Sequence, residues 1–412
     1  MFRDDTEINS FTMSESHQGA GLPRQASTAR RVVEAHRQSR IGLTVALTFL
    51  AAAAIAAIAP HDSGAWLPLH LFLVGSLLTA ISSVTQLLAV TWSASPAPRR
   101  ALARAQLACL GVGAILVAAG RESNTDAVVG VGGAAVVVAL GTLAAILWRI
   151  RSQATTPRFA PAIDGYLGAI GFSIVGTVLG VTTAVGGLPS WGIKATSAHI
   201  DANVLGLVGL IIAATVPYFV ATQARMKMSP RATPHRVRIA TGALAAGTAT
   251  ALCGHGVDSG IILAVGYGTY AGALVWLVTL LPQVRRRQLD WAGPRLVQLG
   301  AGLAWWFAMA ILLTIASLAD TPDRSNVIRA LVIGGYAQIL ASSLAYLGPV
   351  LRGGGHQLLS EGFATTRSWV SLAAGNIAGF GALTGHRPTL ALSLSIWGVD
   401  IALRWLRLAT SR

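Results

Sequence analysis

Long apolar runs dominate the hydrophobic pattern of this chain. From residue 41 onward, apolar runs alternate with short polar connections. A helix needs about 20 apolar residues to cross ~30 Å of hydrocarbon, and each run has about that length. We therefore expect an all-α, polytopic membrane bundle of about twelve transmembrane helices, at 41–60, 66–92, 101–119, 127–148, 162–183, 197–222, 236–253, 259–282, 294–318, 327–351, 366–383 and 388–406.

The first 40 residues have a different composition. They are polar, rich in Ser, Thr, Gln and Arg, and too poor in apolar residues to bury a core. We expect 1–40 to be a disordered tail and 41–412 to be the transmembrane domain. Arg30 and Arg31 ahead of the first run also resemble an export signal with cleavage near Pro60. The long tail and the weak cleavage pattern favour a retained helix.

Composition supports the membrane assignment. Hydrophobic residues make up 53% of the chain and charged residues only 11%, against roughly 25% charged in soluble domains. The net charge of +15 comes from clusters between the apolar runs, where basic residues meet lipid headgroups. Nucleic-acid binding is therefore not expected. Cys109 and Cys253 lie in apolar segments, so we expect neither a disulfide framework nor a thiolate metal cluster.

The basic residues also predict the orientation. With the N-terminus in the cytoplasm, 26 of the 31 Lys and Arg fall in cytoplasmic segments, as the positive-inside bias requires. A wrong number of spans would scramble this alternation. The sequence thus predicts a multi-pass protein of the plasma (inner) membrane, embedded in the lipid bilayer, with both termini cytoplasmic.

An internal repeat runs through the chain. Similar segments surround Gly75, Gly206 and Gly334, which lie 131 and 128 residues apart on the second, sixth and tenth predicted spans. The repeat predicts three pseudo-equivalent four-helix units. In the expected orientation the polar heads of these spans, His70, His199 with Asp201, and Arg329, all lie near the outer leaflet.

Histidines provide the candidate ligands of this region. Ionisable groups within a span usually line a site or a wet cavity, although these could simply cap helices at the interface. His70 and His199 are the best metal or heme ligands, and His255 at the outer end of the seventh span is a third. Asp201 should point away from His199, whereas Asn203, four residues on, should be its hydrogen-bond partner.

Two further features bear on packing and binding. Arg329 has a planar donor fork that suits a heme propionate or a quinone oxygen, although snorkelling to outer headgroups is the favoured interpretation. Gly176-x-x-x-Gly180 and Gly268-x-x-x-Gly272 predict close contacts between helices.

Several short motifs resemble a known family. They are Leu67-Pro-Leu-His70-Leu-Phe-Leu-Val-Gly75, the segment Ala198–Gly209 with Pro217 and Arg225-Met226 downstream, and Ala345-Tyr-Leu-Gly-Pro-Val-Leu-Arg352. These motifs, with the three four-helix units, resemble heme-copper oxidase subunit I. They are nearest to its related transmembrane domains that occur alone or fused to multicopper oxidase or copper nitrite reductase modules in actinobacteria.

This resemblance implies a heme or copper cofactor, redox-linked activity and a periplasmic or extracellular copper oxidoreductase as partner. Oxidases of this fold bind heme between histidines of the second and tenth spans, and copper through three histidines of the sixth and seventh. Here the tenth span has Arg329 and no histidine, and the seventh has only His255. We expect degenerate metal sites and no active terminal oxidase. A small-solute transporter or channel and a cofactor-free membrane scaffold are the alternatives.

Overall fold

The computed structural model describes residues 22–58, 66–187, 192–319, 323–353 and 355–410, and these form helices without any strand. In chain order the elements are α1 (Leu22–Ile58), α2 (Trp66–His70), η1 (Leu71–Leu77), α3 (Leu78–Ser93), α4 (Arg100–Glu122), α5 (Asp126–Ser152), η2 (Pro157–Phe159), α6 (Ala160–Ala184), α7 (Gly192–Asp201), η3 (Ala202–Gly209), α8 (Leu210–Gln223), α9 (Pro234–Val257), α10 (Gly260–Thr279), α11 (Arg286–Ala292), α12 (Pro294–Ala319), α13 (Arg324–Ala330), η4 (Leu331–Ala337), α14 (Gln338–Arg352), α15 (Gly355–Thr366), α16 (Trp369–Leu383) and α17 (Arg387–Thr410).

The membrane spans agree with the predicted ones. Within the described residues, 11 helices are long and apolar enough to cross a bilayer. The remaining predicted span, the eleventh in chain order at 366–383, corresponds to the 15-residue α16, which at 1.5 Å per residue covers only ~22 Å. Many large apolar side chains on the outside of the bundle, such as Val138, Ile261 and Leu403, are exposed. An all-α polytopic membrane protein accounts for this surface.

The first helix begins earlier than the sequence indicated. Residues 22–40, assigned above to the disordered tail, belong to α1, whereas 1–21 lie outside the described residues. Contacts between helices explain the difference. Glu34 forms an ion pair with Arg100 at the start of α4, and Ser39 donates a hydrogen bond to the backbone oxygen of Ser83 at 3.3 Å. These partners, distant in sequence, stabilise a segment whose composition alone suggests disorder.

The three four-helix units are visible in the packing. They comprise α1 to α5, α6 to α10, and α12 to α17. In each unit the first span packs against the second, and the third and fourth pack as a hairpin: α4 with α5, α9 with α10, and α16 with α17. The second span of each unit contains one π-helical turn: η1, η3 and η4.

Glycines at equivalent positions make the contacts within the units. A Cβ added to Gly75 would lie 2.3 Å from the Phe49 ring. At Gly206 it would lie 2.5 Å from the Phe172 side chain, and at Gly334 2.7 Å from the Trp305 ring. A second series closes the hairpins: a Cβ added to Gly120, Gly254 or Gly381 would lie 2.7–2.9 Å from the backbone nitrogen of the residue nine positions on, which is Val129, Leu263 or Leu390.

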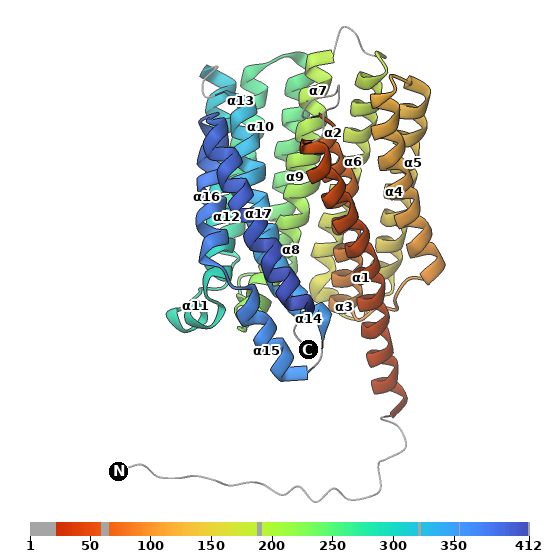
Figure 1. The fold of residues 1–412 in the computed structure, drawn as a ribbon, viewed down its shortest axis with the longest axis vertical. Helices are drawn as coiled ribbons and strands as arrows, with labels where there is room; N and C mark the ends of the chain where they lie inside the picture. The colour runs from red at the N-terminus through yellow and green to blue at the C-terminus, as the bar shows by residue number, and fades with distance from the viewer. Residues whose placement is uncertain (1–21, 59–65, 188–191, 320–322, 354, 411–412) are drawn as a thin grey trace, which may run out of the picture.

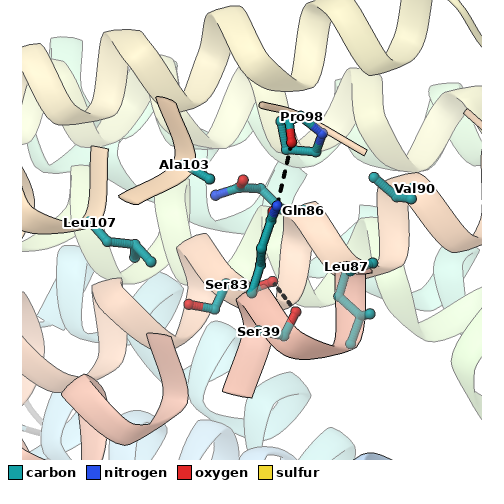
Figure 2. Close-up of a pocket in the computed structure, with 10 residues that line it drawn as sticks. Ser39, Ser83, Gln86, Leu87, Val90, Pro98, Ala103 and Leu107 are labelled. Carbon is teal, nitrogen blue, oxygen red and sulfur yellow. Dashed lines mark hydrogen bonds between the residues drawn. The ribbon is translucent and has the colours of Figure 1, made fainter. Parts of the chain in front are cut away.

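The bundle has two distinct ends (Figure 1). We name the end at which α2, α7 and α13 begin the histidine end. The opposite end, where α11 and α15 lie and where α1 begins and α17 finishes, is the arginine end (Figure 1). A small cavity near the arginine end, lined by Ser39, Ser83, Gln86, Pro98 and Leu107 among others (Figure 2), has a volume of only ≈ 10 Å³. That is about the room one water molecule needs.

We expect Gly254→Ala to destabilise the protein although alanine favours helix formation, because the added methyl group meets the Leu263 backbone, which cannot move aside cheaply. Overpacking of this kind costs about 1–3 kcal/mol. Denaturant unfolding in mixed micelles measures the free energy of unfolding. Gly242→Ala on the same helix is the control, since no atom lies within 4 Å of its added Cβ. Equal stabilities of the two variants would contradict the close hairpin.

Candidate functional site

Two imidazoles lie opposite each other at the histidine end. His70 closes α2, and His199 lies in the last turns of α7. Their ring centroids are 6.5 Å apart and the ring planes differ by only 6°. The ring of Trp66, one turn before His70, has its centroid 3.9 Å from that of the His70 ring, and the two ring planes differ by 20°. Trp66 therefore packs against the His70 ring.

Backbone carbonyls fix the orientation of both rings. Nδ1 of His70 lies 2.9 Å from the backbone oxygen of Trp66, and Nδ1 of His199 lies 2.6 Å from that of Gly176 on α6. A carbonyl can only accept, so each Nδ1 carries the proton and donates it. In the neutral imidazole the lone pair is then on Nε2. Within the described part of the chain, neither Nε2 has a hydrogen-bond partner.

Small residues of α6 make room for His199. A Cβ added to Gly180 would lie 2.6 Å from Nδ1 of His199, and one at Gly176 would lie 2.4 Å from Nδ2 of Asn203. The first predicted glycine pair therefore does allow close contact. The second pair makes no comparably close contact within the described chain: a Cβ added to Gly268 would lie 3.7 Å from Thr314, and one added to Gly272 would have no neighbour within 4 Å. Contact of this pair with a second copy of the chain stays a prediction.

Asn203 is the predicted partner of His199. Its Nδ2 donates to the backbone oxygen of His199 at 2.9 Å and lies 3.5 Å from His199 Nδ1. Its Oδ1 accepts from Ser173 of α6 at 3.2 Å. Asn203 thus lies beside His199, as the four-residue spacing predicts, but it bonds to the backbone oxygen of His199 and not to the imidazole, and it joins the start of η3 to α6.

Asp201 is the centre of a second, buried cluster. Its side chain is 0% exposed. Oδ2 accepts from Nε2 of His255 at 2.8 Å and from the hydroxyl of Tyr267 at 2.5 Å. Oδ1 accepts from Nη2 of Arg324 at 2.5 Å. The carboxylate and the guanidinium neutralise each other, as a buried charge requires.

This cluster fixes the rotation of α7. Successive residues of an α-helix are ~100° apart, so residues two apart point to nearly opposite faces. Asp201 faces α9, α10 and α13, which supply His255, Tyr267 and Arg324, whereas His199 faces α6 and α2. The Asp201 carboxylate thus joins the second unit to the third, and the His199 imidazole points toward the first unit. The two side chains point in different directions, as predicted.

The remaining predicted residues lie apart from the histidine pair. The side chain of Arg329 is exposed, and it is Arg324, five residues earlier, that enters the bundle. His255 uses its Nε2 on Asp201. Among the described residues, no group of three or more His, Cys, Asp or Glu is arranged to hold a metal ion. A metal site that includes His255 and a binding role of Arg329 stay predictions.

Arg324 and Tyr267 are the site residues that sequence reasoning missed. One signal was available for Arg324, because it is among the few basic residues outside the expected cytoplasmic segments. Such a residue needs either a headgroup or a buried acid, and Asp201 was the one acidic residue within the sixth span. No comparable signal marked Tyr267, whose hydroxyl lies 66 positions along the chain from its partner.

Known proteins add no assignment to this geometry. The chain matches no protein-family model, and no curated protein is significantly similar to it.

Replacing Asp201 by Asn should destabilise the fold strongly, because the Arg324 guanidinium would lose its buried counter-charge. Loss of one partner of a buried ion pair costs about 3–5 kcal/mol. Tyr267→Phe removes only one hydrogen bond to a charged group and should cost about 1.5–3 kcal/mol. Denaturant unfolding in micelles provides both values.

The matched control is Asp258→Asn. Asp258 pairs with Lys194 at 3.0 Å, but its side chain is 73% exposed, so its loss should cost less than about 1 kcal/mol. The double variant Asp201→Asn/Arg324→Gln should lose less free energy of unfolding than the sum of the losses in the two single variants. Additive losses would show that the two side chains are not coupled.

Proposed function

We propose that the protein is a redox-linked membrane protein that holds a heme between His70 and His199 at the histidine end. The observation that carries the proposal is the pair of parallel rings at 6.5 Å with both Nδ1 atoms bound to backbone carbonyls. This arrangement leaves two Nε2 lone pairs for a metal. It is also the usual arrangement of metal-binding histidines, whose second nitrogen donates to a carbonyl or carboxylate.

The ring separation would leave room for one metal ion between the two imidazoles. If both Nε2 atoms bound one metal ion, bonds of about 2.0–2.1 Å would place them ~4 Å apart, and half a ring on each side would add about 2 Å more. The resulting centroid distance of about 6 Å is close to the 6.5 Å between His70 and His199. Direct stacking contact would bring the rings nearer, as Trp66 and His70 show at 3.9 Å.

The donor set favours heme over copper, the other predicted cofactor. A structural or redox metal ion bound by protein alone takes three or four side-chain ligands, and the described residues offer two here. A heme macrocycle supplies four nitrogens itself, so one or two axial side chains suffice. Two half-buried imidazoles with no third described ligand therefore fit a heme.

The chain's own residues orient and shield the pair. The backbone oxygens of Trp66 and Gly176 accept hydrogen bonds from the two Nδ1 atoms. The hydrogen bonds of Asp201 to its three partners fix the rotation of α7 about its axis. The bound heme would supply one-electron redox chemistry, with a potential set by its axial ligands and by burial. Electron transfer to a copper oxidoreductase is part of this proposal. In the orientation expected from the positive-inside bias, the histidine end lies on the outer side, where such a partner would bind.

Likeness to the oxidase subunit supports the proposal at the level of architecture. Three four-helix units and a histidine at the head of the second span agree with that resemblance. The third unit departs from it, because its second span has Arg329 where a histidine would be needed. The proposal is accordingly a heme held by the first and second units, with no oxygen-reducing centre.

The protein purified from cells with adequate heme supply should show a Soret band and sharp visible bands on reduction, as six-coordinate heme does. His70→Ala and His199→Ala should each remove most of the sharp bands, since one axial ligand is lost. Heme-to-protein stoichiometry by pyridine hemochrome measures the occupancy. His235→Ala, an exposed histidine at the arginine end, should leave the spectrum unchanged.

His255→Ala separates this proposal from a three-histidine metal site. His255 is bound to Asp201 and not to the pair, so its loss should lower stability while the reduced spectrum keeps its sharp bands. Copper content by elemental analysis should be unchanged and low. A folded, colourless wild-type protein would exclude the heme, and copper that disappears in His255→Ala would favour the copper site instead.

A further inference from the structure

A fully buried arginine lies at the arginine end, far from the histidine pair. Arg295 follows Pro294 at the start of α12 and is 1% exposed. Its guanidinium carbon lies 4.9–5.2 Å from the ring centroids of Trp291, Tyr346 and Phe363. Nη2 donates to the backbone oxygen of Gln223 at 3.4 Å. No described carboxylate lies within ion-pair distance of this guanidinium.

Two more arginines gather around the same tryptophan. The guanidinium carbon of Arg225 lies 4.2 Å from the Trp291 ring, and the Nη2 of Arg367 donates to the backbone oxygen of Trp291. None of the three arginines has an ion-pair partner among the described residues. Cation–π contacts stabilise each charge by a modest amount, but they do not neutralise three positive charges in one place.

Unpaired donors concentrate at this place. Of ten buried side-chain atoms without a hydrogen-bond partner in the described residues, five belong to four residues here. They are Nε and Nη1 of Arg295, Nε of Arg367, and the amide nitrogens of Gln223 and Gln298. All five are donors, so what is missing is an acceptor with several oxygens. Water could satisfy some of these donors, but it brings no negative charge.

The fold does not require an arginine at this position. The aromatic residues that pack on the repeat glycines, Phe49, Phe172 and Trp305, define equivalent points on α1, α6 and α12. Ten residues before them, within the same continuous helices, stand Ser39, Ala162 and Arg295. All three are buried. Small residues occupy this position in the first two units, so an arginine here is particular to the third unit.

We propose that Arg225, Arg295 and Arg367 form a binding site for a phosphate group. Guanidinium groups bind phosphate oxygens through paired N–H donors, and a phosphate brings both the charge and the acceptors that this cluster lacks. Arg225 is exposed and forms the entrance, with Arg295 as the buried wall. The source is either the headgroup of an anionic phospholipid, bound in a basic pocket between spans, or a soluble phosphate.

The site is independent of the heme proposal, because it lies at the other end of the bundle and shares no residue with the histidine pair. Native mass spectrometry of the full chain, released from bilayers of equimolar phosphatidylglycerol and phosphatidylcholine, tests the lipid source. Thermal unfolding of the delipidated protein with increasing inorganic phosphate, against chloride at equal ionic strength, tests the soluble source. Retained phosphatidylglycerol or a phosphate-specific rise of the midpoint supports the proposal and identifies the source.

Arg225→Gln and Arg295→Gln should each weaken the bound form by about tenfold or more, the usual effect of losing a hydrogen bond between charged groups. Arg225 is exposed, so we expect Arg225→Gln to fold. If Arg295→Gln does not fold, the binding measured for Arg225→Gln tests the proposal. Arg287→Gln, an exposed arginine of α11 at the same end, is the control. Absence of both phosphatidylglycerol retention and phosphate stabilisation, or equal binding by Arg225→Gln and Arg287→Gln, would overturn the proposal.

Discussion

Close approach of helices at glycine is the contact on which this bundle depends. In a bilayer there is little hydrophobic drive for one helix to leave lipid for another, so packing and internal hydrogen bonds must hold the spans together. Gly75, Gly206 and Gly334 let an aromatic ring lie against the backbone of each unit's second span. A π-helical turn surrounds each of them. The three second spans are thereby placed alike, and their polar first turns gather at one end.

Much of this organisation could be predicted because it is local. The spans follow from hydropathy, the units from the spacing of Gly75, Gly206 and Gly334, and the Asn203–His199 contact from helical periodicity. The series Gly120, Gly254 and Gly381 was also present in the sequence. Its spacing of 134 and 127 residues could have strengthened the repeat. Each of these features depends on residues within one helix or on a period along the chain.

Partners between units could not be predicted in the same way. Asp201 finds Arg324 across 123 positions, and nothing in the sequence prefers Arg324 over Arg329. Five residues on a helix are more than one turn, so one arginine enters the bundle and the other stays exposed. Likewise Ser39 and Glu34, which the sequence assigned to the tail, lie in a helix and contact Ser83 and Arg100. Tertiary contacts decide these cases, and composition cannot report them.

The candidate sites lie at positions where the three repeated units differ from one another. Counted from the glycines, His70, Asp201 and Arg329 are equivalent, yet one faces a histidine, one anchors an ion cluster and one is exposed. His199, two residues before Asp201, has no polar counterpart in the other units, where Pro68 and Val327 stand. At the other end, Arg295 replaces Ser39 and Ala162. A fold shared by three units needs none of these side chains, so the chemistry of the protein is to be sought where the units differ.

The two ends satisfy buried charge in opposite ways, and this difference separates a structural cluster from a binding site. At the histidine end Asp201 has three donors and one cation, and the cluster is complete within the chain. At the arginine end three guanidiniums gather around one tryptophan, with no described carboxylate within ion-pair distance of them and with five buried donors unpaired. Burial of uncompensated charge is costly, so a stable fold needs an anion there. Asp201 is therefore a positioning residue for His199, whereas Arg295 awaits a ligand from outside the bundle.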